Sequence, residues 1–532
     1  MRTLTALTAL SMLIPLALGC GVPEESLEDL EAVPGREDNY RSSANQEFSA
    51  TAKAQVVLDS SLEAAPDAER LAKATELVSA KLLQVGWFLN LFVSDKESED
   101  ANASYGGFHA MARNASVKAL TVEPVDKLTF AFNFEATIAG PNDFMELVPG
   151  QDQPDGGKLV DLKMGKISNQ SLLSGTWQSS YGVHGWDPSK VDDADLETLV
   201  LTVKPVARSS NAFLNYQALY ADGKLTVGAQ FGWDYNKGRQ DLQNAQQLYR
   251  DLCELGFESP VTRYEDLKLD SAPLTRTSVV GGKTVEVEVK LVHPGMVASP
   301  STDAVKLREA LLEMLATREV ILFNGHAGVS GRLLPADFQS ATAGNIKPEE
   351  YPTLQLLPGF QLLLIAGCQT YARFTDGFRQ NPLKRGPNGE LINMDIVTTA
   401  SYSWTSQGAE SMEAILFPLV GRSASTQVKP ATWDDVLRSL NAPPNNTTFF
   451  GVNGIDNDPH GHPYARLDLL GRSCTSNAGC GGEGNLCVKT PASKTKRVCG
   501  TVCLDDAGCA ADYRCAAIAS QSSIYGKACI AR

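Results

Sequence analysis

A histidine and a cysteine each follow a short apolar stretch that is typical of a buried strand. Residues 320–324 lead into Gly-His326, and residues 362–366 lead into Gly-Cys368, 42 residues further on. In open α/β sheets, ligands bind at the carboxyl ends of the strands. An imidazole beside a thiol can hold it as a thiolate, the nucleophilic form of cysteine. The spacing therefore predicts a nucleophile–base pair, Cys368 and His326, at one edge of a sheet.

Two other interpretations of Cys368 stay open on the sequence. A cysteine in an apolar strand is most often a small buried hydrophobe. It can also form a disulfide, and Cys253 is the only other cysteine outside the N-terminal segment and the C-terminal cluster. Cys253 lies in a predicted helix among Leu248, Leu252 and Leu255, which favours a buried thiol over a bridge.

The elements that must position the pair lie in a domain predicted for residues 221–430. Strands are expected at 224–233 and 285–292, and helices at 239–255 and after Asp303, a favoured N-cap residue. Strands that alternate with helices indicate a sheet covered by helices.

Residues 49–220 follow a different pattern. Helical periodicity over 67–94 is followed by alternation over 128–138, which places three phenylalanines on one side. Further strands are expected at 199–204 and 214–220. We therefore predict a β-rich accessory or pro-domain here.

The order of features in 221–425 resembles the caspase-like superfamily of cysteine peptidases, which includes caspases, gingipains, legumains and separases. In that superfamily an apolar strand ends in His-Gly, and another ends in Ala-Cys roughly 50 residues downstream. The helix closed by Leu-Gly-Phe257 and the segment 396–404 also fall in the expected order. The resemblance implies an α/β fold with a mostly parallel sheet flanked by helices, and a peptidase activity.

Carried over by position, Cys368 is the nucleophile and His326 the general acid–base. The oxyanion rests on the backbone N–H groups of Cys368 and Ala327, and Gln369 and Trp404 line the substrate groove. The chain departs from the family at Ala327, where Gly is usual, and Cys368-Gln-Thr lacks the glycine that caspases place after their nucleophile. The resemblance requires neither a metal nor an organic cofactor, and it implies a protein or peptide as the substrate.

The C-terminal residues 473–532 hold most of the cysteines. Cys-Thr-Ser-Asn-Ala-Gly-Cys recurs as Cys-Leu-Asp-Asp-Ala-Gly-Cys, which indicates two copies of a four-cysteine unit. Eight cysteines allow 105 pairings, and the sequence does not choose among them. Zinc is the rival ligand, but its structural sites usually have tight Cys-x2–4-Cys pairs. We therefore predict a disulfide module formed by Cys474, Cys480, Cys487, Cys499, Cys503, Cys509, Cys515 and Cys529.

The N-terminal residues 1–20 have the features of an export signal. An apolar run ends in Ala17-Leu18-Gly19-Cys20, which resembles the lipobox of bacterial lipoproteins except that Leu is usual at the position of Ala17. Cys20 is then the lipidated residue, and an ordinary cleaved signal peptide is the alternative. Residues 21–48 are acidic and few are aromatic, which predicts a flexible tether. Since no later stretch is long and apolar enough to span a bilayer, lipid is the only membrane anchor we expect.

Charge and two loops complete the sequence evidence. The formal net charge of −15 argues against nucleic acid as a partner. Lys384-Arg385 forms an exposed basic pair, either a self-processing site or a plain surface turn. Residues 453–462 offer carboxylates and two histidines, which suit either a metal or a polar connector within 431–472.

The sequence therefore predicts an exported bacterial cell-envelope protein, held at the outer membrane or the cell surface. Its expected activity is hydrolysis of peptide bonds by a Cys368/His326 dyad through an acyl-enzyme. The alternative is a non-catalytic binding or adhesion lipoprotein on a degenerate peptidase fold.

Overall fold

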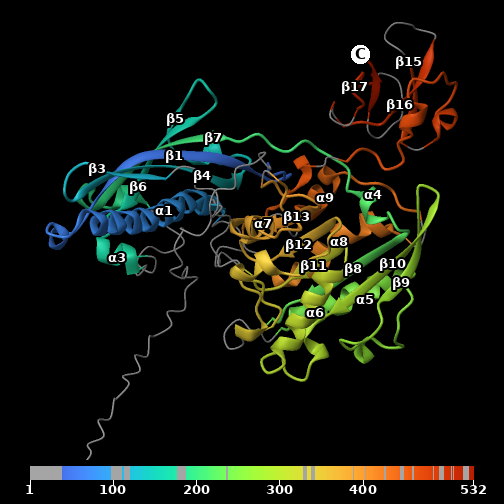
Figure 1. The fold of residues 1–532 in the computed structure, drawn as a ribbon, viewed down its shortest axis with the longest axis horizontal. Coiled ribbons are helices and arrows are strands. Elements are labelled where there is room, and N and C mark those ends of the chain that lie inside the picture. The colour runs from blue at the N-terminus through green and yellow to red at the C-terminus, as the bar shows by residue number, and fades with distance from the viewer. Residues whose placement is uncertain are drawn as a thin grey trace, which may run out of the picture.

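The structure is a computed structural model in which an antiparallel N-terminal domain, a helix-flanked second sheet and a small C-terminal module follow one another (Figure 1). The predicted signal, the lipidation site Cys20 and most of the tether lie outside the described residues. The structure describes residues 39–97, 111–112, 120–174, 177, 187–234, 238–327, 332–336, 342–387, 389–401, 403–423, 427–443, 448–457, 460–482, 484–489, 496–504, 506, 509–518 and 526–532. Within these residues, no helix is long and apolar enough to cross a membrane.

The N-terminal domain is a seven-stranded antiparallel sheet. Its order is β2-β4-β1-β7-β6-β5, with β3 also paired to β4. The strands are β1 (Asn45–Val57), β2 (Met111–Ala112), β3 (Thr121–Pro124), β4 (Thr129–Pro141), β5 (Gln151–Asp152), β6 (Lys158–Gly165) and β7 (Leu196–Pro205). The helix α1 (Asp67–Glu97) runs along one face, and α2 (Phe144–Leu147) and α3 (Asn169–Ser174) are short (Figure 1).

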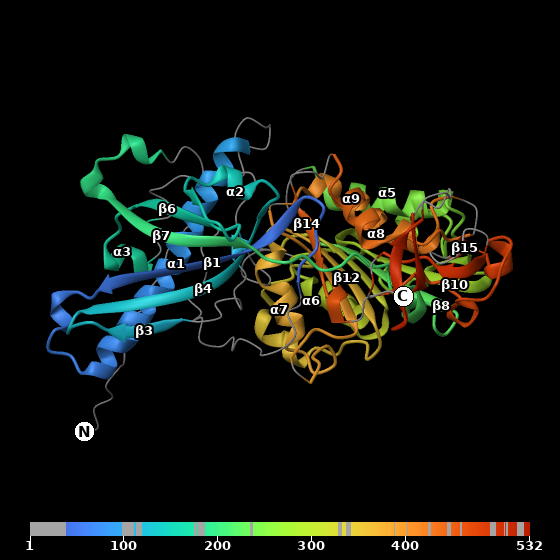
Figure 2. The same cartoon turned by 90° about the horizontal axis from the view of Figure 1, so that it is seen from above.

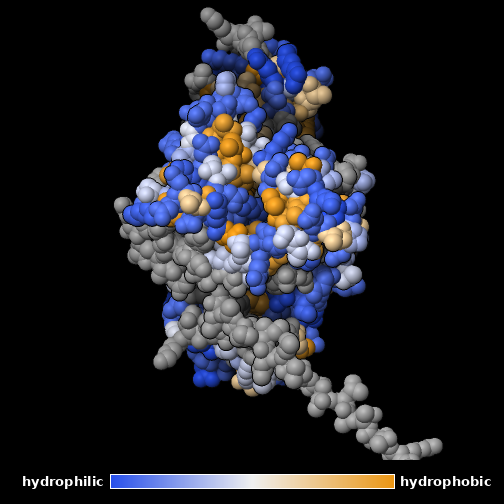
Figure 3. Space-filling model, turned by 90° about the vertical axis from the view of Figure 1, so that its left-hand side faces the viewer, coloured by the Kyte–Doolittle hydropathy of each residue, from blue (hydrophilic) through white to orange (hydrophobic). Residues whose placement is uncertain are grey.

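Alternation along β4 builds the core of this domain. Phe130, Phe132 and Phe134 are all buried, as the spacing predicted, and they pack with apolar side chains of α1. The expected apolar face of α1 is only partly right, because Leu71 near its start is 41% exposed. Apolar patches lie among hydrophilic side chains on the end of the molecule that this domain forms (Figure 3).

Two predictions for the first 220 residues are wrong. Residues 214–220 form the short helix α4 (Tyr216–Leu219), not a strand, because the Asn215 side chain accepts the Ala218 N–H and caps a helical turn. The predicted tether ends early, since residues 39–48 are structured. Tyr40 and Phe48 are buried there, and their apolar area favours order.

The second sheet is also seven-stranded, but its five central strands are parallel. Its order is β14-β13-β12-β11-β8-β10-β9, and only the edge strands β14 and β9 run antiparallel to their neighbours. The strands are β8 (Lys224–Phe231), β9 (Leu274–Val280), β10 (Lys283–Val292), β11 (Val320–Asn324), β12 (Gln361–Ala366), β13 (Met394–Thr399) and β14 (Phe450–Asn453).

Helices cover both faces of this sheet, which confirms the predicted α/β class. Apolar side chains of α5 (Gln240–Glu254), α8 (Gly408–Val420) and α9 (Trp433–Leu440) pack on one face. Those of α6 (Ala304–Thr317) and α7 (Phe374–Arg379) pack on the other. Alternate residues of β11 enter the two cores, with Leu322 on one side and Phe323 on the other.

The two domains are joined at the edge of the second sheet. Before β1 begins, Arg41 exchanges both backbone hydrogen bonds with Val452 of β14, at 2.9 and 2.8 Å. Figure 2 shows the start of β1 reaching toward β14. Arg41, just before the first sheet begins, thus forms one antiparallel bridge with the edge strand β14 of the second sheet.

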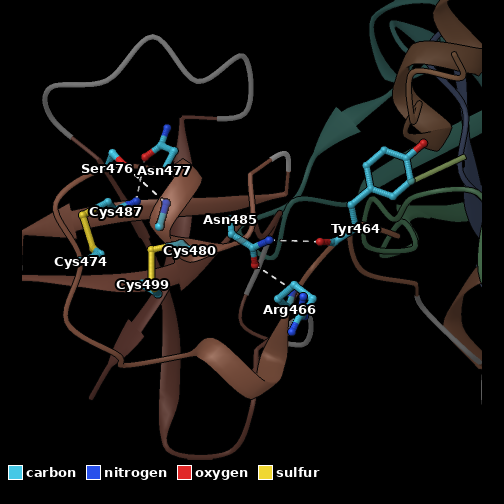
Figure 4. Close-up of a disulfide and its surroundings, with 10 residues drawn as sticks. Tyr464, Arg466, Cys474, Ser476, Asn477, Cys480, Asn485, Cys487 and Cys499 are labelled. Atoms are coloured by element: carbon cyan, nitrogen blue, oxygen red, sulfur yellow. Dashed lines mark hydrogen bonds between the residues drawn. A yellow bond between two sulfur atoms is a disulfide. The ribbon is translucent and has the colours of Figure 1, made fainter. Parts of the chain in front are cut away.

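The C-terminal module consists of two hairpins, and its cysteines form the predicted disulfides. The hairpins are β15 (Asn485–Lys489) with β16 (Arg497–Thr501), and β17 (Tyr513–Ala517) with β18 (Lys527–Ala531). In both units the first cysteine pairs with the third and the second with the fourth (Figure 4 shows the first unit). The bonds are Cys474–Cys487, Cys480–Cys499, Cys503–Cys515 and Cys509–Cys529.

The module is anchored to the rest of the chain. Phe213, which precedes the second sheet, is fully buried in the apolar core of the module. Asn485 of β15 accepts the Arg466 N–H at 2.8 Å and donates to the Tyr464 carbonyl at 3.1 Å (Figure 4). These contacts tie the module to the connector.

Candidate active site

His326 and Cys368 follow two strands that are adjacent and parallel. β11 and β12 pair in register, with Asn324 opposite Ala366. The Gly325 N–H donates to the Ala366 carbonyl at 3.1 Å, so pairing continues one residue past β11. Each functional residue then comes two positions after its strand ends. Parallel topology therefore brings the two predicted residues to neighbouring positions at one edge of the sheet.

Glycines let the chain segments at this edge approach closely. A Cβ added at Gly367 would lie 2.6 Å from the Cβ of Ala327, the residue after His326. A Cβ added at Gly325 would lie 2.8 Å from the Cα of Gly232, which follows β8. Real side chains do not tolerate such distances, so Gly is required at both positions for this packing.

The His326 imidazole is partly buried, and two carboxylates influence its protonation. Burial lowers the pKa of His326, while the negative charges of Asp234 and Asp241 act in the opposite direction. Both carboxylates are buried, with Asp234 1% and Asp241 4% exposed. Burial is the larger effect, so the pKa of His326 lies below its usual value, and the two carboxylates limit that decrease.

The two aspartates have different supports. Asp234 follows β8, and its carboxylate accepts the Gln240 N–H at 3.0 Å at the start of α5. Asp241 lies in the first turn of α5 and forms two hydrogen bonds with Arg239, at 2.9 and 2.8 Å. The helix N-terminus and the guanidinium both stabilise negative charge at this place.

Sequence reasoning missed Asp234, although a signal for it exists. β8, β11 and β12 all lead directly into glycine, at Gly232, Gly325 and Gly367. A polar residue follows within two positions of each glycine: Asp234, His326 and Cys368. The first of these was overlooked because the expected strand ran on to residue 233.

Cys368 is half-buried and is not in a disulfide, and neither is Cys253. The bridge between them that the sequence left open is therefore wrong. The Cys368 Sγ lies 3.9 Å from the Ser403 carbonyl oxygen, a distance at which a thiol donates a weak hydrogen bond. Trp404 follows Ser403 in the chain and is partly buried, so its backbone lies near the Cys368 thiol.

The backbone just after Cys368 adopts a left-handed conformation. Gln369 has φ 55° and ψ 36°, its side chain is buried, and its N–H donates to the Ser401 carbonyl at 2.8 Å. Non-glycine residues with positive φ are uncommon and cluster at functional sites. The turn that carries the thiol is therefore held in a conformation that the rest of the fold must enforce.

The basic pair at 384–385 differs from the sequence expectation. Lys384 is fully buried and only Arg385 is exposed. The Lys384 ammonium donates to three backbone carbonyls, those of Leu357, Gly359 and Asn393, at 2.8, 2.7 and 3.2 Å. Burial lowers the pKa of Lys384 to about 7. An exposed dibasic site is therefore wrong, and Lys384 instead ties three chain segments together.

The candidate ligands at 453–462 are directed to different partners. Asn453 accepts from the Thr375 hydroxyl at 3.3 Å, and Asp456 accepts from the Asn39 N–H at 2.9 Å. The His462 ring meets Phe213 edge-on. In the part of the chain that the structure describes, which omits Asp458, the only clusters of candidate metal ligands are cysteine groups that are disulfide-bonded. The predicted connector 431–472 is wrong in its first part, because α9 and β14 belong to the second domain and Asn453 is the last residue of β14.

No protein-family model, curated protein or solved structure matches this chain. The chemistry of the site therefore has to be inferred from its residues and their geometry.

Proposed function

We propose that this protein is a cell-envelope lipoprotein that hydrolyses peptide bonds as a cysteine endopeptidase of the caspase-like type. The observation that carries the proposal is the junction of β11 and β12, where two adjacent parallel strands lead into His326 and Cys368. Burial lowers the pKa of His326 and so favours the neutral imidazole, which is the form that accepts the thiol proton, while two buried carboxylates stabilise the imidazolium that then forms.

The reaction follows from these groups. His326 accepts the thiol proton, and the Cys368 thiolate attacks the carbonyl carbon of the peptide. The N–H groups of Cys368 and Ala327 stabilise the oxyanion. His326 returns its proton to the leaving amine, a thioester acyl-enzyme remains, and water hydrolyses it to release the acid and restore the thiol. Gln369 and Trp404 flank the path of the substrate.

The location of the protein belongs to the same proposal. Lipid on Cys20 anchors the chain to the bacterial outer membrane or the cell surface. Four disulfides suit an oxidising compartment, where they form and persist. Substrates are then proteins or peptides that reach the envelope.

The activity is tested with the full mature chain and a mixture of peptides of varied sequence. Cleavage products and a covalent adduct on Cys368, detected by mass spectrometry after acid quenching, are the expected result. Cys368→Ala removes both, while Cys253→Ala, a matched loss of a half-buried thiol, keeps both. Cleavage that survives Cys368→Ala, or a folded wild-type chain that cleaves nothing, contradicts the proposal.

A non-catalytic surface binding role is the second candidate. The observation that favours it is the C-terminal pair of disulfide units, which share one bonding pattern and so form a repeated element. Under this alternative, binding of the chain to whole cells or to matrix proteins is unchanged in Cys368→Ala and is lost when residues 473–532 are deleted.

A further inference from the structure

The turn that carries Cys368 is attached to the N-terminal domain. Tyr371 lies three residues after Cys368, in the 3-10 turn Thr370–Ala372, and it is fully buried. Its hydroxyl donates to the carboxylate of Glu47 at 2.6 Å. Glu47 belongs to β1 and is 4% exposed, so this bond between two domains is shielded from water. Hydrogen bonds to a charged acceptor in such surroundings are among the stronger ones.

Apolar contacts reinforce the same attachment. The ring of Tyr371 meets the ring of Tyr40 edge-on, with 5.1 Å between centroids. Tyr371, Ala372 and Ala400 are buried in the apolar core of the N-terminal sheet, although they belong to segments that follow β12 and β13. The thiol-bearing turn is thus built into the core of the other domain.

This attachment lies beside the left-handed residue Gln369. That conformation is unfavourable for a non-glycine residue, so the turn needs restraint from both sides. On one side, the hydroxyls of Thr370 and Thr399 lie 3.0 Å apart, and Thr399 also donates to the Gly367 carbonyl. On the other side, the restraint is the bond between Tyr371 and Glu47.

We propose that Glu47 and Tyr371 are positioning residues for the Cys368 thiol, and that the N-terminal domain is an integral part of the catalytic centre, not a removable pro-domain. This inference rests on the proposed peptidase function. Without the bond to Glu47, the turn relaxes at Gln369 and the Cys368 thiol is displaced from the edge of the sheet at which His326 also lies. A shift of about 1 Å at a reacting atom is enough to cost about 100-fold in rate.

The test compares two contacts between the same domains. Tyr371→Phe keeps the ring and removes the donor of the bond to Glu47. Asp434→Asn is the matched control. Asp434 lies on α9, and Arg41 donates two hydrogen bonds to its carboxylate, at 2.7 and 2.8 Å. The substitution weakens this second contact between the domains and leaves the turn after Cys368 unchanged. Alkylation of Cys368 by iodoacetamide is followed from pH 5 to 9, together with the thermal midpoint and the steady-state constants.

We expect Tyr371→Phe to slow alkylation about 10-fold or more and to lower kcat with little change in KM. Asp434→Asn lowers the thermal midpoint without changing the alkylation rate. In Glu47→Gln an acceptor for the Tyr371 hydroxyl remains, so we expect the alkylation rate of Cys368 to stay within about 3-fold of the wild-type rate. This is the result expected if the bond serves to position the turn.

Two results overturn the inference while the proposed function stands: wild-type alkylation rates in Tyr371→Phe, or an equal loss of rate in Asp434→Asn. A wild-type thiol that does not react near neutral pH is a different outcome. It contradicts the proposed peptidase and, with it, the positioning role.

Discussion

The two large sheets have the same number of strands and comparable apolar cores, but the ends of their strands are placed differently. In the N-terminal sheet every pairing is antiparallel, so consecutive strand ends fall at opposite edges. At one such end, Asp126 only caps a turn by accepting the N–H groups of Leu128 and Thr129. In the second sheet, β8, β11 and β12 are parallel, and their ends meet at one edge.

The difference shows how topology concentrates chemistry. Asp234, His326 and Cys368 are far apart in the sequence, and each follows a strand and a glycine. Parallel pairing alone is enough to gather them. An antiparallel sheet of equal size stabilises its domain but distributes its strand ends over two edges. We therefore expect changes in the first sheet, away from the Glu47 contact, to affect stability, and changes at this edge of the second sheet to affect reactivity.

The largest expected effect on stability is in the N-terminal sheet. Phe132→Ala removes a buried ring from β4 and lowers the free energy of unfolding by about 3–5 kcal/mol. Chemical denaturation measures this loss. Phe132 lies opposite Ala54 of β1, seven residues along that strand from Glu47, so we expect the alkylation rate of Cys368 under native conditions to stay at the wild-type value. A large fall in that rate would show that the two sheets are not separable in this way.

The next effect is at the junction of β8 and β11. Gly325→Ala places a Cβ 2.8 Å from the Cα of Gly232, and backbone cannot yield as a flexible side chain can. The ends of the strands must separate, and we expect peptide hydrolysis to fall about 100-fold. Gly359→Ala is the matched control, because a Cβ there meets nothing within 4 Å. Equal activity in the two variants would refute the close approach.

A smaller effect concerns charge. Asp234→Asn removes a carboxylate that opposes the effect of burial, so the pKa of His326 falls further below its usual value. The imidazolium is then lost at lower pH, and the alkaline limb of the pH–rate profile moves toward acid. We expect about a 10-fold loss of activity at the alkaline side and less at the acid side. A profile that keeps its shape would mean that Asp234 does not act through His326.

The smallest effect is a gain. Gly86 lies within α1, and a Cβ added there meets nothing within 4 Å. Gly86→Ala therefore raises the free energy of unfolding by about 0.5–1 kcal/mol through helix propensity alone. Calorimetry should show a higher thermal midpoint with unchanged hydrolysis. The same substitution is thus predicted to stabilise in the first domain and to damage the site at Gly325.

Much of the second sheet was predictable because its strands are short, apolar and followed by glycine. β11 and β12 were found within one residue of their bounds, and α5 likewise. Pairing within the cysteine module was not predictable. Cys487 and Cys499 lie opposite each other in the hairpin, yet each bonds a cysteine that precedes it, Cys474 and Cys480, and no local pattern specifies this choice.

Two of the failures have long-range contact as their physical cause. Lys384 looked exposed because turn residues surround it, yet carbonyls from distant segments accept all of its donors. The bond between Glu47 and Tyr371 joins residues 324 positions apart, and no local pattern encodes it. Local sequence therefore predicted the two strands that lead into His326 and Cys368, but not the domain that contacts the turn after Cys368.

The central claim is that His326 activates Cys368, and it is tested most directly by thiol labelling across pH in the wild type and in His326→Ala. The account predicts rapid alkylation of Cys368 near neutral pH, and a rate at least about 10-fold lower in His326→Ala, where the thiolate loses its imidazolium partner. Alkylation that is slow in the wild type, or that is indifferent to His326, would contradict it.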